Sequence, residues 1–144
     1  MPVSPQEIRQ KLHAFDLARD RLLIELAREA GLSPIDLHAL EHLEAGGPLT
    51  PGELQQRVGL TSGSTTALID RLERAGWVRR AGNPADRRSV LVELTDVAGD
   101  AGDAQLGQYH RAIARITRDL SPAERRAVGR FLDAAAAAAD RGRQ

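Results

Sequence analysis

The sequence predicts a mainly helical protein that carries one small β-hairpin near its middle. Three observations predict this fold class: helix starts marked by a capping residue and a proline, two short helices joined by a glycine-containing turn, and two short alternating segments after them. With 144 residues, of which 42% are hydrophobic and 28% charged, the chain suits a single globular domain over residues 1–144.

Four helix starts share one pattern, in which a serine or threonine precedes a proline and an acid follows at the third helical position. The hydroxyl caps free backbone amides, proline suits a first position that needs no N–H donor, and the acid faces the positive end of the helix. Where that acid is a glutamate, it can also complete a capping box. The four capping residues are Ser4, Ser33, Thr50 and Ser121, and Thr95 before Asp96 gives a weaker fifth start.

The middle of the chain shows two short helices around a Gly-Leu-Thr turn. The first reads TPGELQQRV from Thr50, and the second reads SGSTTALIDRLERAG from Ser62. Helices joined by such a short turn are typical of a helix-turn-helix. On the second helix, one face carries Thr65, Leu68, Ile69 and Leu72, and the other carries Ser62, Gly63, Thr66, Ala67, Asp70 and Arg74. The small residues of the second face suit entry into a DNA major groove, although hydroxyl residues at a helix start also serve as caps.

A β-hairpin follows this second helix directly. Its strands are expected at Trp77–Ala81 and Ser89–Thr95, joined by a turn that contains Gly82, Asn83 and Pro84. Together with the preceding helices, the hairpin makes a winged helix-turn-helix with a two-stranded β wing.

The helices on either side carry more apolar residues than a small winged helix needs for its own core. They include Ile8, Leu12, Phe15, Leu22, Ile113, Ile116, Val128, Phe131 and Leu132. Such residues would form a large exposed patch on a monomer, whereas a two-fold dimer buries them. We therefore expect the DNA-binding winged helix at residues 33–95 and helical dimerisation parts at residues 1–32 and 96–144.

The net charge of zero conceals a basic middle part. Residues 57–95 carry seven arginines and four acids, whereas residues 1–56 have an excess of four acids. Asp86, Arg87 and Arg88 stand together at the expected wing tip. Arginines there can enter a minor groove, because a narrow groove concentrates negative potential. Asp86 is expected to orient or neutralise one of the two arginines.

The stretch from Leu49 to Gly99 resembles the MarR family of bacterial transcriptional regulators. The resemblance lies in the short helix, Gly-Leu, a Ser/Thr-rich helix start, and the runs DRLERAGWVRR and DRRSVLVELT. It implies a homodimer whose first and last two helices interlock and whose winged helices bind a pseudo-palindromic operator in double-stranded DNA. It also implies a small aromatic acid as effector. The expected function is sequence-specific transcriptional regulation, as a repressor relieved by that ligand, without a cofactor.

The residues expected to contact DNA lie on the second helix of the pair, called the recognition helix, beside it and in the wing. On the recognition helix they are Ser62, Ser64 and Thr66; Arg57 and Arg74 are expected as phosphate contacts, and Arg87 and Arg88 belong to the wing. The resemblance places Asp70 near the base of the wing, where we expect it to hold Arg88 and so to fix the angle of the wing. Many relatives carry a larger polar residue where this chain has Ala67, and Gly63 also lies in this helix. Readout is therefore expected to rest on hydroxyls and groove shape.

Two other functions are weighed against DNA binding. A winged helix can also serve as a protein-interaction module without specific DNA binding, because a fold alone does not fix a function. The run from His38 to His42 has the His-x-x-Glu-His pattern of one class of zinc peptidases. Nothing in the sequence supplies a third ligand or the larger context of those enzymes, so no catalytic site is expected. A regulatory metal at this histidine pair stays an alternative.

The sequence also bears on effector binding and location. Cysteine is absent, which excludes disulfides, thiolate metal sites and cysteine nucleophiles. No apolar run is long enough to span a membrane, and the N-terminus lacks an apolar signal segment, so a cytoplasmic, nucleoid-associated protein is expected.

An effector pocket between the dimer helices and the winged helix would be lined by Phe15, Leu37, His38, Leu40 and Tyr109. A filled apolar core without a ligand is the alternative.

Overall fold

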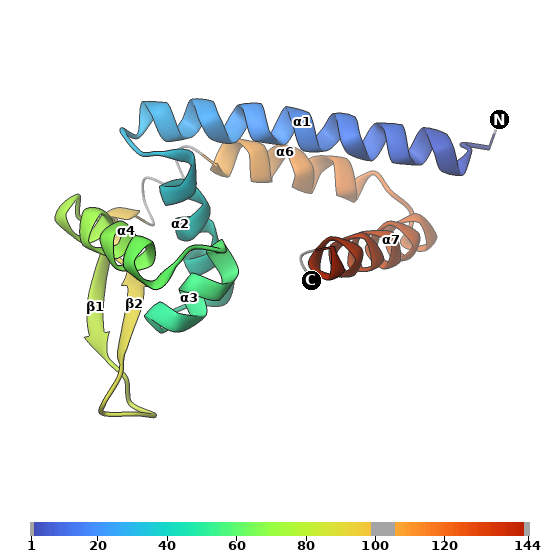
Figure 1. Ribbon diagram of the computed structural model, residues 1–144. Helices are drawn as coiled ribbons and strands as arrows, with labels where there is room; N and C mark the ends of the chain where they lie inside the picture. Colours follow the sequence, from blue (N-terminus) through green and yellow to red (C-terminus); the bar gives the residue numbers. More distant parts are fainter. Residues whose placement is uncertain (1, 99–105, 143–144) are drawn as a thin grey trace. The chain divides into compact units, whose positions relative to one another are not determined.

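The computed structural model describes residues 2–98 and 106–142, and the chain divides into two compact units, Met1–Gly102 and Asp103–Gln144. Each unit is described by itself. The first contains α1 (Pro5–Glu29), α2 (Pro34–Gly46), α3 (Pro51–Val58), α4 (Ser62–Arg74), β1 (Val78–Gly82) and β2 (Val90–Leu94) (Figure 1). The second contains α6 (Gly107–Arg118) and α7 (Pro122–Arg141). The predicted fold class, mainly helical with a two-stranded wing, is confirmed.

All four predicted helix starts are present, and each closes a capping box. The caps begin α1, α2, α3 and α7, and in each the hydroxyl accepts from the N3 amide while the N3 acid accepts from the cap N–H. At α2 the acid is Asp36 rather than a glutamate, and its shorter side chain still reaches the Ser33 N–H at 3.0 Å. Residues 96–98 are helical after the weaker start at Thr95, whose hydroxyl accepts from the Ala98 N–H at 3.3 Å. The rest of the helix expected after Thr95 lies partly outside the described residues.

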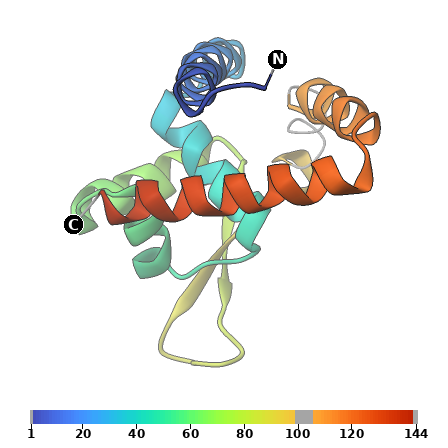
Figure 2. The same ribbon diagram turned by 90° about the vertical axis from the view of Figure 1, so that its right-hand side faces the viewer.

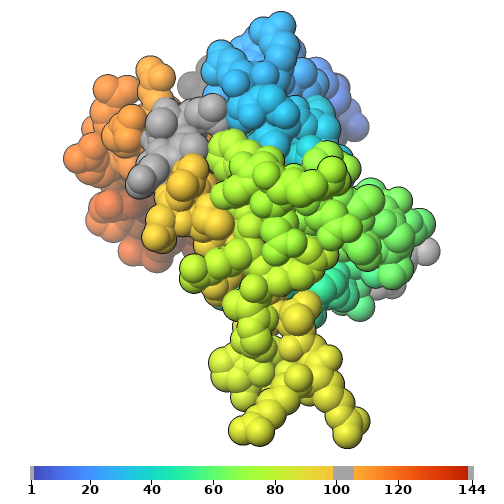
Figure 3. Space-filling model, turned by 90° about the vertical axis from the view of Figure 1, so that its left-hand side faces the viewer, coloured from blue at the N-terminus to red at the C-terminus, as the bar shows by residue number. Residues whose placement is uncertain are grey.

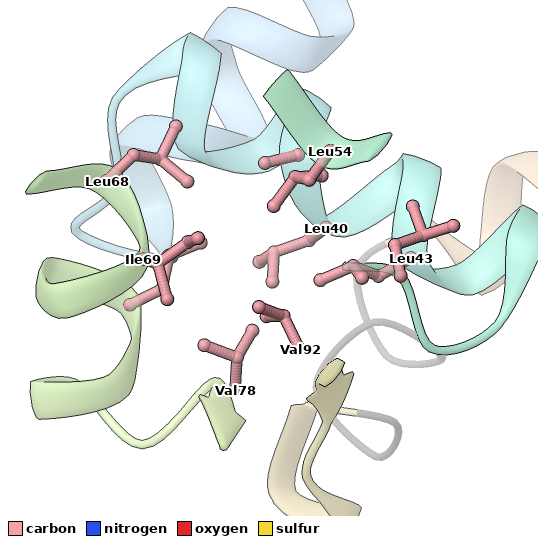
Figure 4. Close-up of a cluster of buried hydrophobic side chains, with 10 residues drawn as sticks. Leu40, Leu43, Leu54, Leu68, Ile69, Val78 and Val92 are labelled. Atoms are coloured by element: carbon pink, nitrogen blue, oxygen red, sulfur yellow. The ribbon is translucent and has the colours of Figure 1, made fainter. Parts of the chain in front are cut away.

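One apolar core joins α2, α3, α4 and both strands of the first unit. Its buried members converge in Figure 4. They are Ala39, Leu40, Leu43, Leu49, Leu54, Leu68, Ile69, Leu72, Val78 and Val92. Because three helices and the hairpin share these contacts, the position of α4 is set by residues of every neighbouring element.

The hairpin is antiparallel, with Val78 opposite Leu94 at its base and Gly82 opposite Val90 at its outer end. Side chains alternate as expected for a half-buried strand, since Val92 is fully buried and Val90 is 40% exposed. Leu49, which precedes α3, forms a bridge to Val92 on the other side of β2 through hydrogen bonds of 2.7 and 3.0 Å. This third segment beside the sheet was not predicted from the sequence.

The hairpin and its loop over residues 83–89, together called the wing, project away from the helices of the first unit (Figure 2). In the space-filling view the wing tip stands clear of the surface formed around α4 (Figure 3). At the other end of the unit α1 is joined to α2 by an ion pair, in which Arg19 Nη2 lies 2.5 Å from Glu41 Oε1. None of the helices in the described residues is long and apolar enough to cross a membrane.

The second unit consists of α6 and α7, and its apolar side chains are largely exposed in the single chain. No residue of α7 is buried, and Val128, Phe131 and Leu132 are between 39% and 50% exposed. Ile113 and Ile116 of α6 are also exposed. The predicted assignment of residues 1–32 and 96–144 to dimerisation, and of the whole chain to a single domain, stays a prediction.

Candidate nucleic-acid interface

The start of α4 presents exposed hydroxyl side chains besides that of its helix cap, and the Ser64 hydroxyl accepts from the Thr61 hydroxyl at 2.9 Å. α3 ends at Gly59, whose φ of 77° suits a residue without a Cβ, and the chain then turns into α4 through Thr61. The Thr61 hydroxyl accepts from the Ser64 N–H at 3.2 Å and is therefore the cap. Ser62, Ser64 and Thr66 are exposed.

The two faces of α4 are divided as the sequence predicts. Thr65, Leu68, Ile69 and Leu72 are buried, and Thr65 satisfies its hydroxyl by donating to the Thr61 carbonyl at 2.8 Å. The residues of the opposite face are all exposed, namely Ser62, Gly63, Thr66, Ala67, Asp70 and Arg74. The Thr66 hydroxyl donates to the Ser62 carbonyl at 3.1 Å, which leaves its oxygen able to accept a further hydrogen bond. The exposed face is thus narrow, polar and free of bulky side chains along its first two turns.

The two arginines expected beside this face are both exposed. Arg57, in the last turn of α3, lies with its guanidinium close to Gly46, where an added Cβ would come within 2.6 Å of Arg57 Nη1. Arg74, in the last turn of α4, donates to the Asp70 carbonyl at 3.3 Å.

The wing tip is shaped by Asn83 and Asp86. Asn83 Oδ1 accepts from the Ala85 N–H at 3.0 Å, and its amide donates to Ser89 Oγ at 2.8 Å across the loop. Asp86 Oδ1 accepts from the backbone N–H of Arg88 at 2.9 Å. Asp86 therefore holds the main chain of the loop, and no ion pair of the described residues joins it to an arginine side chain. The side chains of Arg87 and Arg88 are exposed.

At the base of the wing the partner of Asp70 differs from the one expected. Asp70 Oδ1 lies 2.7 Å from Arg80 Nη2, whereas Arg88 was the partner expected from the sequence. The strand register explains the difference, because Arg88 lies beyond the Gly82–Val90 pair at the outer end, while Arg80 is opposite Val92 and nearer to α4. The predicted Asp70–Arg88 pairing is wrong for this structure, and the part played by Arg80 was not predicted.

A second missed contact anchors α4 from its inner side. Arg71 donates from Nη2 to Asp36 Oδ1 at 2.5 Å and from Nε to Asp36 Oδ2 at 3.3 Å. Burial by itself would raise the pKa of Asp36, but the hydrogen bonds from Arg71, and from the N–H and hydroxyl of Ser33, outweigh it and hold that pKa below its usual value. In the sequence Asp36 is recognisable only as the acid of a cap motif, so no local pattern indicated that it pairs with Arg71 on α4.

The histidine pair lies on α2 outside this interface. The rings of His38 and His42 stack with centroids 4.8 Å apart, and Glu41 between them binds Arg19. Within the described residues, no group of three or more potential metal ligands comes together. A hollow of about 260 Å³ between α1 and α2 is lined by Arg19, Asp20, Leu23, Ile24, Pro34 and His38.

Only part of the expected effector lining is found at this hollow. His38 lines it, but Leu37 and Leu40 are buried, with Leu40 part of the apolar core, and Phe15 is 43% exposed. Tyr109 belongs to the second unit. The effector pocket as drawn from the sequence therefore stays a prediction.

Comparison with known proteins decides the family. A model of the MarR family matches residues 30–89. Over 123 residues the chain is 32% identical to the multiple antibiotic resistance protein MarR of Escherichia coli (strain K12), which covers 78% of this chain and 79% of that protein. The chain belongs to the MarR family. The family named from the sequence is thereby confirmed.

Two further similarities extend this comparison. The uncharacterized HTH-type transcriptional regulator YcgE of Bacillus subtilis (strain 168) is 43% identical over 95 residues, which make up 65% of this chain and 58% of that relative. The chain thus spans little more than half the length of that relative. The crystal structure of a mutant MarR from E. coli complexed with operator DNA superposes with a TM-score of 0.57 at 27% identity, over 89% of this chain and 92% of that one. Several relatives that match the chain, YcgE among them, are named transcriptional regulators.

Proposed function

We propose that this MarR-family chain is a sequence-specific regulator that binds double-stranded DNA as a homodimer and acts as a repressor. The observation that carries the proposal is the joint exposure of two DNA-sized features on the first unit. The small residues of α4 and the arginines of the wing are exposed, and α4 and the wing are both visible in the view of Figure 3. The solved E. coli relative with operator DNA supports the same use of this fold.

The proposed contacts follow from the shapes of the two features. Because Ser62, Ser64 and Thr66 are short, the front of α4 can approach the floor of a major groove and reach base edges or phosphates. Arg57 and Arg74 would flank it as phosphate contacts. The wing tip would place Arg87 and Arg88 in the neighbouring minor groove, where negative potential favours arginine. Base readout by long side chains is sparse in this arrangement, so groove shape contributes much of the specificity.

The homodimer is supported by apolar surface that one chain leaves uncovered. α7 buries none of its residues, and Ile8 and Phe15 of α1 are 39% and 43% exposed. Light scattering at micromolar concentration should therefore give twice the 15.6 kDa mass of the chain. A mass near that of one chain would contradict the dimer. Two winged helices related by a two-fold axis would then read a pseudo-palindromic operator.

The same proposal covers effector and location. We propose that the effector is a small aromatic acid. We also propose that the protein is cytoplasmic and associated with the nucleoid, and that its role is regulatory rather than catalytic. Arg19 and His38 line the hollow between α1 and α2 and offer groups that could pair with a carboxylate. Titration of a protein–operator complex with a panel of phenolic acids tests the effector. Release by none of them would favour a filled core without a ligand.

A genomic selection of DNA fragments bound by the purified protein tests the function itself. We expect enrichment of one pseudo-palindromic sequence, and affinity that falls with salt by about 0.9 log units per log unit for each phosphate neutralised. Equal binding to every duplex would leave an architectural protein rather than a regulator, because specificity is a ratio of affinities. Absence of DNA binding at low salt would favour the protein-interaction module.

A further inference from the structure

One residue of the wing, Arg80, forms three hydrogen bonds to α4. Its Nη2 donates to Asp70 Oδ1 at 2.7 Å, and its Nη1 donates to Glu73 Oε2 at 2.5 Å. Its backbone N–H donates to Glu73 Oε1 at 3.2 Å. The strand itself, and not only a flexible side chain, is therefore attached to the helix.

The geometry suits arginine and two acids in particular. Residues three apart on a helix share a face, so Asp70 and Glu73 present their carboxylates side by side. A guanidinium is planar and offers separate N–H groups to each of them, which a single ammonium group does less well. Isolated surface ion pairs contribute little to stability, but a shared, partly shielded network is a stronger constraint. Here the Arg80 side chain is only 31% exposed.

The attachment lies where it can control the rest of the wing. Among the hydrogen bonds of the described residues, Arg80 is the outermost hairpin residue that is bonded to a helix. Beyond it the pairs Ala81–Leu91 and Gly82–Val90 and the tip loop extend away from the helices (Figure 2). At the base the chain leaves α4 through Gly76, whose φ of 81° makes a sharp turn. A small rotation at this base moves the tip over a longer path.

We propose that Arg80 is a positioning residue that fixes the direction of the wing relative to the recognition helix α4. By occupying Asp70 and Glu73, it also leaves the side chains of Arg87 and Arg88 available for DNA. The effect of Arg80 on DNA binding rests on the proposed function, but the direction of the wing is a property of the protein alone. The two can therefore be tested separately.

The neighbouring arginine provides a matched control. Arg79 Nε lies 2.6 Å from Glu93 Oε1, directly across the hairpin, so this pair joins the two strands to each other and not to α4. Arg79→Gln removes the same charge from the same strand and also breaks an ion pair. It should leave the direction of the wing unchanged.

The test measures the position of the wing tip without DNA. Because the chain contains no cysteine, spin labels can be attached only where Gln56→Cys in α3 and Ala85→Cys in the tip loop introduce one. Labelled chains are mixed with excess unlabelled chains so that one chain per dimer carries labels. Double electron–electron resonance then gives the distribution of distances between the labels at positions 56 and 85. Arg80→Gln, Asp70→Asn and Glu73→Gln should each broaden it. Arg80→Gln combined with Asp70→Asn should broaden it no more than Arg80→Gln does, because the two act through one contact.

DNA binding gives the second readout. In Arg80→Gln we expect affinity for the selected operator to fall by about 10-fold, a typical coupling for groups in contact. The salt slope should stay that of the parent, because Arg80 is bonded to α4 and not to a phosphate. Arg80→Lys should show an intermediate loss, and Arg79→Gln should retain both the narrow distance distribution and the parent's affinity.

The outcomes separate this proposal from the proposed function. A narrow distribution in both Arg80→Gln and Asp70→Asn would overturn the positioning role, whatever the DNA result. Broadening of equal size in Arg79→Gln would also overturn it, since any lost charge would then loosen the wing. A parent protein that fails to bind any DNA would overturn the proposed function, while the distances would still decide the role of Arg80. Should Arg80→Gln unfold, the two acid variants decide in its place.

Discussion

Asp36 and Arg71 connect the first turn of α2 to the recognition helix α4, with Arg71 Nη2 2.5 Å from Asp36 Oδ1. The same carboxylate accepts the backbone N–H of Ser33 at 3.0 Å and so closes the capping box of α2. Asp36 is 2% exposed, whereas the Arg71 side chain is 48% exposed. One buried acid thus caps the start of α2 and also binds α4 to that helix.

Replacing this acid should destabilise the first unit. Asp36→Asn keeps the size of the side chain but removes its charge, and we expect a loss of about 1.5–3 kcal/mol in the free energy of unfolding, the usual range for hydrogen bonds to charged groups. Urea unfolding can be followed by the fluorescence of Trp77, the only tryptophan, which packs against the core. Arg71→Met should cost at least as much, because it leaves a buried carboxylate without its partner. A loss no larger than that of Ser33→Ala would mean that the ion pair adds nothing to the cap.

The same pair predicts a dependence of stability on pH. The pKa of Asp36 is lower in the folded chain than its ordinary value of 3.8, so its stabilising effect is complete above that value and is lost as the pH falls through the folded pKa. The capping acids Glu7, Glu53 and Glu124 also have lowered pKa values and act in the same direction. The difference in unfolding free energy between wild type and Asp36→Asn should therefore be constant above about pH 5 and shrink below about pH 4. A difference that stays constant to pH 2 would contradict the assigned pKa direction.

The elements of the fold were predictable because their signals are local. Caps such as Ser4 and Thr50 specify helix starts through residues only three positions apart, and the alternation around Val92 specifies a half-buried strand. The pairing of Leu49 with Val92 was missed, since it joins segments 43 residues apart in numbering and Leu49 carries no strand pattern of its own. A single bridged residue gives no periodicity to detect.

The candidate site was predictable as a surface but not as a network. Helical spacing alone separates the exposed face of α4 from its buried face, so Ser62 and Thr66 could be placed without a structure. The partner of Asp70 depends on the register of the hairpin and on its angle to α4, neither of which is encoded in local spacing. The position of Arg88 next to the expected strand pointed to that arginine, and the strand register brings Arg80 to the acid instead.

The alternation of the second strand predicts very different costs for two identical substitutions. Val92 is fully buried and Val90 is 40% exposed. Val92→Ala removes two carbons from a packed core and should cost about 2–3 kcal/mol in unfolding free energy, from lost burial and the cavity left behind. Val90→Ala should change it by less than about 0.5 kcal/mol. Equal costs, measured by urea unfolding, would contradict the strand register.

The two arginines of the wing tip should contribute to operator binding in the same way. Neither Arg87 nor Arg88 takes part in an ion pair among the described residues, so each is available to neutralise DNA charge. Arg87→Ala and Arg88→Ala should each weaken operator binding by about 1–3 kcal/mol and lower the salt slope by about one, as measured by fluorescence anisotropy at several salt concentrations. Arg28→Ala is the control, because this arginine lies in the last turn of α1, at the end of the first unit opposite to the wing tip (Figure 1).

In a double-mutant cycle, the effects of Asp70→Asn and Arg88→Ala on operator binding should add to within about 0.5 kcal/mol, since Asp70 is bonded to Arg80. Strong coupling between Asp70 and Arg88 would mean that Arg88 replaces Arg80 on this acid when DNA is bound.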